Sequence, residues 1–216
     1  IPLALLAGVV VLIVSKDMFL DNSPVDIISR TDGIILFCFF LIFQVYSLQV
    51  AKSGVSDDQE VYDTKSFSKL KSVVYILLGF AGLIAGGEFI VSSAVNIAKQ
   101  FGISERVIAL TIVSIGTSLP ELATSVVAAR KKNVDIAIGN IVGSNIFNIF
   151  FILGISAFIN PVLVEAGNYM EIYINIFASV LLFLFIFSGK GRKINKVEGS
   201  IFLILYVSYL LFLIFK

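Results

Sequence analysis

Residues Gly116–Glu121 read Gly-Thr-Ser-Leu-Pro-Glu and lie in a sequence that is otherwise apolar enough to cross a membrane. A carboxylate at bilayer depth is costly and is rarely found there without a partner. Pro120 has no N–H group, so the carbonyl of Gly116 loses its intrahelical donor and can point sideways. Carboxylate, hydroxyl and freed carbonyl oxygens are the ligands that a small hard cation prefers. The hexapeptide therefore predicts a cation site at membrane depth.

The composition of the whole chain is that of a membrane protein. Of its 216 residues, 58% are hydrophobic and 14% are charged, and the mean hydropathy is +1.00. Soluble domains carry about a quarter charged residues. A net charge of +1 offers no basic surface for nucleic acid, and the sequence contains no histidine, which argues against zinc enzymes and Ser-His hydrolases. We therefore expect neither an enzyme, nor a cofactor, nor a nucleic-acid partner.

Apolar segments long enough to cross a bilayer predict an all-α polytopic membrane protein with about seven transmembrane helices. The predicted spans are residues 2–14, 32–50, 72–98, 104–130, 134–160, 169–188 and 197–215. We expect the fourth span to break at Pro120 and the fifth to break around Gly139–Asn140 and Gly143–Ser144. The chain is expected to form a single membrane domain over residues 1–216, in which 1–71 supply the first two spans and a loop.

Basic residues predict how the spans are oriented. Eleven Lys and Arg residues fall in one set of connections and four in the opposite set, with Lys216 at the terminus. By the positive-inside rule, the cytoplasmic loops are those near residues 51–71, 130–133 and 189–196. The N-terminus of the chain is then cytoplasmic and its C-terminus external.

Two groups of acidic residues outside the spans have simpler interpretations than cation binding. The loop 51–71 mixes four acidic residues with lysines, and we interpret it as a solvated linker, with a regulatory cation site as the alternative. Four aspartates between residues 17 and 32 surround Pro24 and predict a turn.

Polar side chains inside the fourth and fifth spans are the candidate ligands. Four of them follow at i, i+3, i+4 and i+7, which places them on one face of a helix: Ser114, Thr117, Ser118 and Glu121. Three more recur every four residues in the next span: Asn140, Ser144 and Asn148. The alternatives are a structural ion pair for Glu121 and interhelical hydrogen bonds for the amides. No basic residue lies inside a span at the depth of Glu121, which favours a bound cation.

These two motifs together resemble the α-repeat of the cation/calcium exchanger superfamily. Residues Gly116–Glu121, followed by Gly139–Asn145 (Gly-Asn-Ile-Val-Gly-Ser-Asn), are most similar to prokaryotic sodium/calcium exchangers, and the motif region runs from about Leu78 to Pro161. Such exchangers have ten helices in two inverted five-helix repeats, and their ions bind where the two α-motifs meet. The resemblance implies that this chain is the C-terminal part of such a protein, with residues 72–216 forming one five-helix repeat.

The resemblance also implies a function and a set of ligands. The function is a secondary antiporter of the plasma membrane that exchanges Na⁺ for Ca²⁺ by alternating access, with the third span as a sliding gate helix. The implied ligands are Glu121, which both ions share, the hydroxyl and carbonyl oxygens of Thr117 and Ser118, the backbone carbonyl of Ser114, and Ser144 and Asn148 from the next helix. The alternatives are a calcium/proton exchanger and an inactive half-transporter that needs a partner repeat.

Two features depart from the family's pattern. The Gly116–Glu121 motif occurs in one copy, and residues 1–75 contain no partner motif, so we expect a missing N-terminal α-repeat. Because the first apolar run is already under way at Ile1, we expect the chain to begin partway through a longer protein. Asn148 stands where relatives sometimes have aspartate in one repeat, which leaves the number and identity of the bound ions open.

Overall fold

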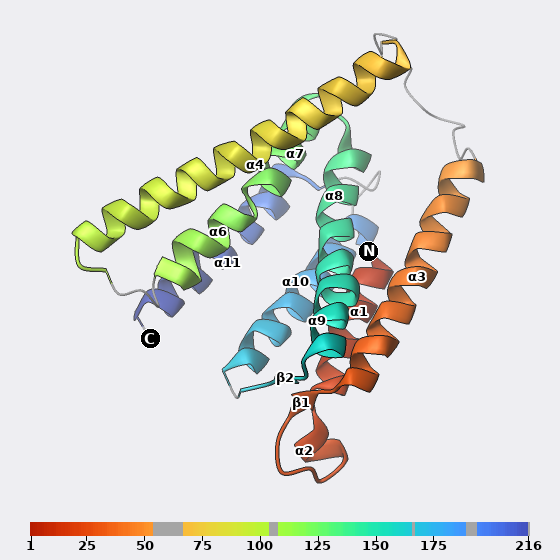
Figure 1. Ribbon diagram of the computed structural model, residues 1–216, viewed down its shortest axis with the longest axis vertical. Helices are drawn as coiled ribbons and strands as arrows, with labels where there is room; N and C mark the ends of the chain where they lie inside the picture. The colour runs from red at the N-terminus through yellow and green to blue at the C-terminus, as the bar shows by residue number, and fades with distance from the viewer. Residues whose placement is uncertain (54–66, 104–107, 166, 189–193, 216) are drawn as a thin grey trace. The chain divides into compact units, whose positions relative to one another are not determined.

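The computed structural model describes residues 1–53, 67–103, 108–165, 167–188 and 194–215 (Figure 1). These residues are almost entirely helical, and they form two compact units. The first unit combines Ile1–Asp57 with Ile138–Glu198, and the second combines Asp58–Ala137 with Gly199–Lys216. The acidic loop that could have been a regulatory cation site falls mainly on residues 54–66, outside the described residues.

The first unit is a bundle of apolar helices closed at one end by a short strand pair. Its elements are α1 (Pro2–Val14), α2 (Asp17–Leu20), β1 (Ile27–Ile28), α3 (Arg30–Ser53), most of α8 (Val134–Ile146), the π-helix η2 (Phe147–Leu153), α9 (Gly154–Ile159), β2 (Val162–Leu163) and α10 (Asn168–Ser188). Helix α3 packs along α9 and η2, and α1 packs along α10 (Figure 1). Strands β1 and β2 are antiparallel, with Ile27 opposite Leu163. The core is built from small and aromatic residues of these helices: Ala4, Ala7, Val11, Ile28, Leu36, Phe40, Ile146, Phe150 and Ala157.

Helices α3 and α9 cross with their backbones in contact. A Cβ added at Gly33 would lie 2.6 Å from the carbonyl oxygen of Gly154 and 2.6 Å from the amide nitrogen of Phe158. Beyond this crossing, aromatic rings fill the interface between α3 and η2. Phe39 stacks on Phe150 with ring centroids 5.3 Å apart. The missing side chain at Gly33 therefore sets the distance at which the two helices meet.

The aspartates near Pro24 form hydrogen bonds within a turn. The backbone N–H of Met18 donates to Asp26 Oδ1 at 2.7 Å, and that of Ile27 donates to Asp17 Oδ2 at 3.0 Å. These bonds tie the two ends of the segment together across Pro24. The prediction of a turn in this segment is confirmed.

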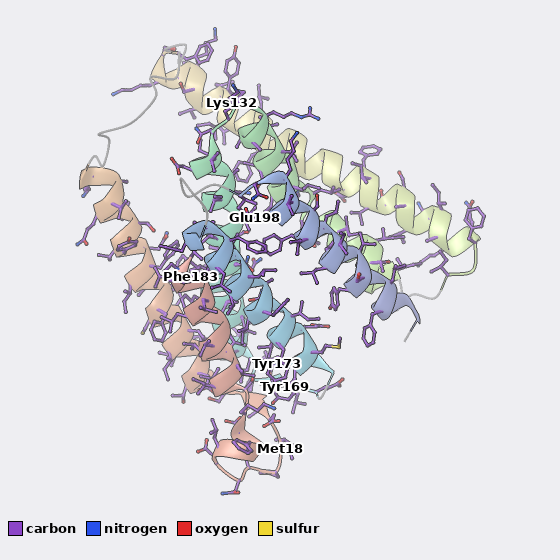
Figure 2. The ribbon with its side chains drawn as sticks, turned by 180° about the vertical axis from the view of Figure 1, so that it is seen from behind. Met18, Lys132, Tyr169, Tyr173, Phe183 and Glu198 are labelled. Carbon is purple, nitrogen blue, oxygen red and sulfur yellow. The ribbon has the colours of Figure 1, made fainter. Side chains whose placement is uncertain are left out.

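Tyr169, at the start of α10, links this turn to the helix bundle by hydrogen bonds. Its hydroxyl donates to Asp26 Oδ2 at 2.6 Å and contacts the carbonyl oxygen of Ser15. The ammonium group of Lys16 lies 3.5 Å from the centre of the Tyr169 ring. Figure 2 shows Tyr169 close to the end of the bundle from which the Met18 segment projects. The loops after α1 and before α10 are therefore linked at the same end of the unit.

The second unit contains one long helix and one broken helix. Its elements are α4 (Lys69–Gln100), the π-helix η1 (Ala109–Val113), α6 (Ser114–Thr117), α7 (Leu119–Arg130) and most of α11 (Lys196–Phe215). Helix α4 contacts η1, α6 and α7. Apart from these contacts α4 is largely exposed, and Ala98 is its one buried residue among those described.

The helices agree with an all-α membrane protein. Within the described residues, four are long and apolar enough to cross a membrane: Arg30–Lys52, Lys69–Gln100, Val134–Ile159 and Asn168–Phe187. The bent pair Thr111–Thr117 and Leu119–Arg130 is a fifth candidate. Pro2–Val14 is a shorter apolar helix, and Lys196–Phe215 is helical as expected. The fold class is confirmed, and the count of seven spans stays a prediction.

One predicted helix break is confirmed and the others are wrong. The fourth span is interrupted at Ser118, two residues before Pro120. The fifth span continues through both glycine pairs, and α8 ends only at Ile146, where η2 begins. Glycine keeps its N–H donor and costs a helix only about 1 kcal/mol, whereas proline removes a donor and clashes with the preceding turn. The glycines of the fifth span are therefore tolerated inside a continuous helix.

Candidate functional site

The break between α6 and α7 brings two helix ends together. Helix α6 ends at Thr117, α7 starts at Leu119, and the two axes differ by 53°. Pro120 lies in the first turn of α7, where a missing N–H removes no intrahelical bond. The last carbonyls of α6 and the first N–H groups of α7 therefore meet at Ser118. Helix ends of this kind expose backbone groups that can bind an ion.

Glu121 lies in the first turn of α7, immediately after the break. The residue is partly buried, and its Oε2 atom is fully buried. The positive end of the α7 dipole stabilises a carboxylate in this position. Glu121 thus lies beside the carbonyl end of α6.

The break corrects the geometry that the sequence suggested for the other candidate ligands. Thr117 is the last residue of α6, Ser118 lies in the junction, and both side chains are exposed. Ser114 is the first residue of α6. These residues and Glu121 do not share one continuous helical face, because the helix changes direction between them. What they share is a position close to the break.

Helix α4 contacts the broken helix near Gly116. Gly116 is buried, and a Cβ added there would collide with the side chain of Val91. A Cβ added at Gly87 would lie 3.9 Å from the carbonyl oxygen of Gly116, the group to which Pro120 cannot donate. The absence of a side chain at Gly116 therefore lets α4 approach the broken helix. Three other glycines of α4 take no part in this contact, because no described neighbour lies within 4 Å of a Cβ at Gly79, Gly82 or Gly86.

The other two predicted ligands lie where α8 passes into the π-helix η2. The hydroxyl of Ser144 donates to the carbonyl oxygen of Ile141 at 3.1 Å. Because its proton is used in this bond, the lone pairs of Ser144 Oγ are available to a cation. Asn148 is exposed and is the second residue of η2. π-Helical turns within α-helices are frequent at functional sites.

The six predicted ligands therefore gather at two helix irregularities. Ser114, Thr117, Ser118 and Glu121 belong to the second unit, and Ser144 and Asn148 belong to the first. That both sets bind one ion stays a prediction. No cluster of three His, Cys, Asp or Glu side chains occurs in the described part of the chain. The predicted ligand set contains one carboxylate together with neutral hydroxyl, amide and carbonyl oxygens.

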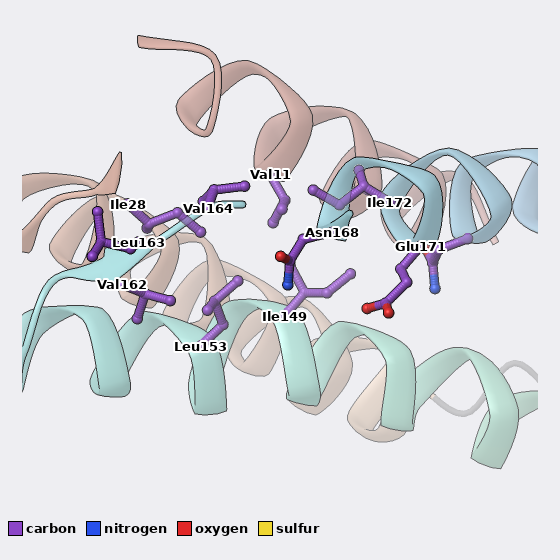
Figure 3. Close-up of a pocket in the computed structure, with 12 residues that line it drawn as sticks. Val11, Ile28, Ile149, Leu153, Val162, Leu163, Val164, Asn168, Glu171 and Ile172 are labelled. Carbon is purple, nitrogen blue, oxygen red and sulfur yellow. The ribbon is translucent and has the colours of Figure 1, made fainter. Parts of the chain in front are cut away.

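The first unit also contains a partly open cavity of about 270 Å³ that the sequence did not predict. Its walls are mainly apolar and come from α1, η2, α10 and both strands. Three polar residues of α10 also line it: Asn168, Glu171 and Asn175. Figure 3 shows Asn168 and Glu171 reaching from α10 toward the helix that carries Ile149. Their spacing of i, i+3 and i+7 is a signal that could have been read from the sequence.

Comparison with known proteins places the chain among ion exchangers. The model of the family described as "Sodium/calcium exchanger protein" matches residues 71–215. The putative antiporter CaxA of Alkalimonas amylolytica is 36% identical over 189 residues, which cover 84% of this chain and 59% of that protein. The sodium/calcium exchanger MaX1 of Methanosarcina acetivorans is 46% identical over 114 residues, which cover 52% of this chain and 33% of that protein.

A solved structure agrees with these relatives. The structure of the sodium/calcium exchanger from Methanococcus jannaschii matches 96% of this chain and 62% of its own chain, with a TM-score of 0.70 and 29% identity. This chain thus spans less than two thirds of the length of these proteins. The family is one of membrane transporters and not a class of enzymes. The chain belongs to the sodium/calcium exchanger family.

Proposed function

We propose that this chain supplies one half of the ion site of a secondary antiporter that exchanges sodium for calcium. The observation that carries the proposal is the position of Glu121 at the α6–α7 break, in a chain of the sodium/calcium exchanger family. Inverted-repeat transporters bind their ions at discontinuous membrane helices, where unwound backbone carbonyls coordinate the cation. The transported ions, Ca²⁺ and Na⁺, are substrates and not cofactors.

The proposed ligands comprise one charged group and several neutral groups. Glu121 supplies the negative charge, and the neutral oxygens come from Ser114, Thr117, Ser118, Ser144 and Asn148. Ca²⁺ takes six to eight oxygen ligands at about 2.3–2.6 Å. A single carboxylate balances only half of its charge, so a second acidic ligand is required. We infer that an N-terminal α-repeat supplies it.

The coupling of the two ions follows from shared ligands. Sodium and calcium compete for the carboxylate of Glu121, so neither occupies the site fully while the other is bound. Alternating access then requires one element to move past the site while the site keeps its shape. Helix α4 is suited to this role because it is 32 residues long, largely exposed, and in contact with α6 through the small residue Gly87.

The proposed arrangement in the membrane is one domain over residues 1–216, with the N-terminus cytoplasmic and the C-terminus external in the plasma membrane. The pairing of β1 with β2 supports this orientation. Residues 27–28 and 162–163 must lie on the same side of the membrane to pair. The positive-inside rule places both segments on the external side.

Substitution of Glu121 tests the proposal. In the full-length protein, reconstituted into vesicles, we expect Glu121→Gln to reduce calcium-45 uptake driven by a sodium gradient roughly 10²- to 10³-fold. The reason is that loss of one partner from a buried charge interaction costs about 3–5 kcal/mol. The matched control is Glu88→Gln, which neutralises an exposed carboxylate on α4 and is expected to retain exchange.

The outcome separates the proposed function from its rivals. Wild-type uptake by Glu121→Gln, or equal loss in both variants, contradicts the ligand role of Glu121. Uptake that a pH gradient drives without sodium indicates calcium/proton exchange instead. A full-length protein that binds calcium without moving it indicates a non-transporting module.

A further inference from the structure

Helices α10 and α8 are joined by a hydrogen bond between two asparagine side chains. Asn175 Nδ2 donates to Asn145 Oδ1 at 3.2 Å. Asn145 Nδ2 in turn donates to the carbonyl oxygen of Ile141 at 3.1 Å. The Asn145 amide therefore accepts from one helix and donates to its own, which selects a single orientation of its side chain.

The carbonyl oxygen of Ile141 is the last acceptor in this series of hydrogen bonds. It also accepts the hydroxyl proton of Ser144, a proposed ion ligand. One residue after Asn145 the α-helix ends, and the π-helix that carries Asn148 begins at Phe147. Where an α-helix passes into a π-helix, the backbone hydrogen bonds shift by one residue, and nearby carbonyls can lose their N–H donors. Side-chain donors can then hydrogen-bond to these carbonyls. The Asn145 amide therefore stabilises the junction between the two proposed ligands.

The position of Asn175 is itself set by a third helix. Its Oδ1 atom is buried, and a Cβ added at Gly8 of α1 would lie 3.4 Å from that oxygen. Gly8 and Asn175 both line the cavity of the first unit, as does Asn168 two turns earlier on α10. Helices α1, α8 and α10 thus meet at the Asn175–Asn145 pair.

We propose that Asn175 is a positioning residue of the ion site. By holding the amide of Asn145, it fixes the α8–η2 junction and with it the directions of Ser144 and Asn148. The inference rests on the proposed function, because Ser144 and Asn148 are ligands only within it. Asn175 itself touches no ion.

The test is the calcium dependence of the melting temperature, Tm, of the full-length protein in detergent. A hydrogen bond of ordinary strength corresponds to a roughly three- to tenfold change in an equilibrium constant. We expect Asn175→Ala to raise by that factor the calcium concentration that gives half of the full Tm increase. Asn145→Ala should do the same, and the double variant should be no worse than Asn145→Ala alone, since both changes remove one interaction.

The control is Asn168→Ala, which removes an amide from the same cavity and is expected to leave the calcium midpoint unchanged. If Asn175→Ala fails to fold, Asn175→Ser replaces it, since serine is polar but ends short of Asn145. A lower Tm without calcium together with an unchanged midpoint would show a merely structural role and overturn the inference alone. A wild-type Tm that does not change when calcium is added would contradict both the proposed function and this inference.

Discussion

Asp17 and Asp26, outside the broken helix, take part in the turn around Pro24. Asp26 shows the chemistry most clearly. The hydroxyl of Tyr169 and the backbone N–H of Met18 donate to its carboxylate, and Lys16 adds a nearby positive charge. In that order, these interactions hold the pKa of Asp26 below its ordinary value of 3.8, against an opposing effect of burial that outweighs the contribution of Lys16. The carboxylate is thus stabilised by partners within the protein.

The lowered pKa of Asp26 predicts an acid-dependent contribution to stability. The folded state favours the ionised carboxylate, so its contribution is fully present above the unfolded pKa and is lost as the pH falls through the folded pKa. We expect Asp26→Asn to have a lower Tm than the wild type near neutral pH, with a difference that shrinks below pH 3.8. Thermal unfolding across this pH range measures the difference, and Asp21→Asn controls for the change in net charge. A difference that stays constant into acid would contradict the assignment.

Among the proposed site residues, those next to Pro120 were the easiest to predict. Proline fixes its own backbone and removes a donor whatever surrounds it, so the break and the position of Glu121 follow from the sequence. The bond between Asn175 and Asn145 could not be predicted, because 30 residues separate the two amides in sequence. Their pairing depends on how α10 packs against α8.

At the scale of helices, apolar length was a sufficient guide to which segments are helical. The contacts between helices were not predictable in the same way. Gly33 and Gly154 occur in separate apolar segments, and nothing in either segment indicates that the two backbones touch. The π-helix η2 was also missed, since its sequence is an ordinary apolar run. Helix existence is decided locally, whereas helix crossings and pitch changes are decided by packing.

The crossing of α3 and α9 predicts that Gly33 tolerates no side chain. A methyl group at Gly33 would meet backbone atoms of α9, which cannot rotate away, so the helices must separate. We expect Gly33→Ala to destabilise the protein by about 1–3 kcal/mol, measured as a lower Tm. The matched control is Gly79→Ala on α4, where the added methyl has open space and alanine is the better helix former. A Tm for Gly33→Ala at or above that of Gly79→Ala would contradict this account of the crossing.

At the scale of the whole molecule, the proposed ligands are distributed over two units. The second unit provides the carboxylate of Glu121 at a broken helix, and the first provides Ser144 and Asn148 beside a π-helix. The family could be predicted from the two motifs and their spacing. The division into units could not, because one boundary falls inside helix α8, between Ala137 and Ile138, where the helical sequence continues unbroken. The account therefore depends on Glu121 being a ligand of the ion.

Anomalous X-ray scattering from crystals of the full-length protein grown with calcium tests this dependence directly. We predict a calcium peak about 2.3–2.6 Å from the carboxylate oxygens of Glu121. Glu121 bound to a lysine or arginine side chain, with no calcium peak beside it, would contradict the account.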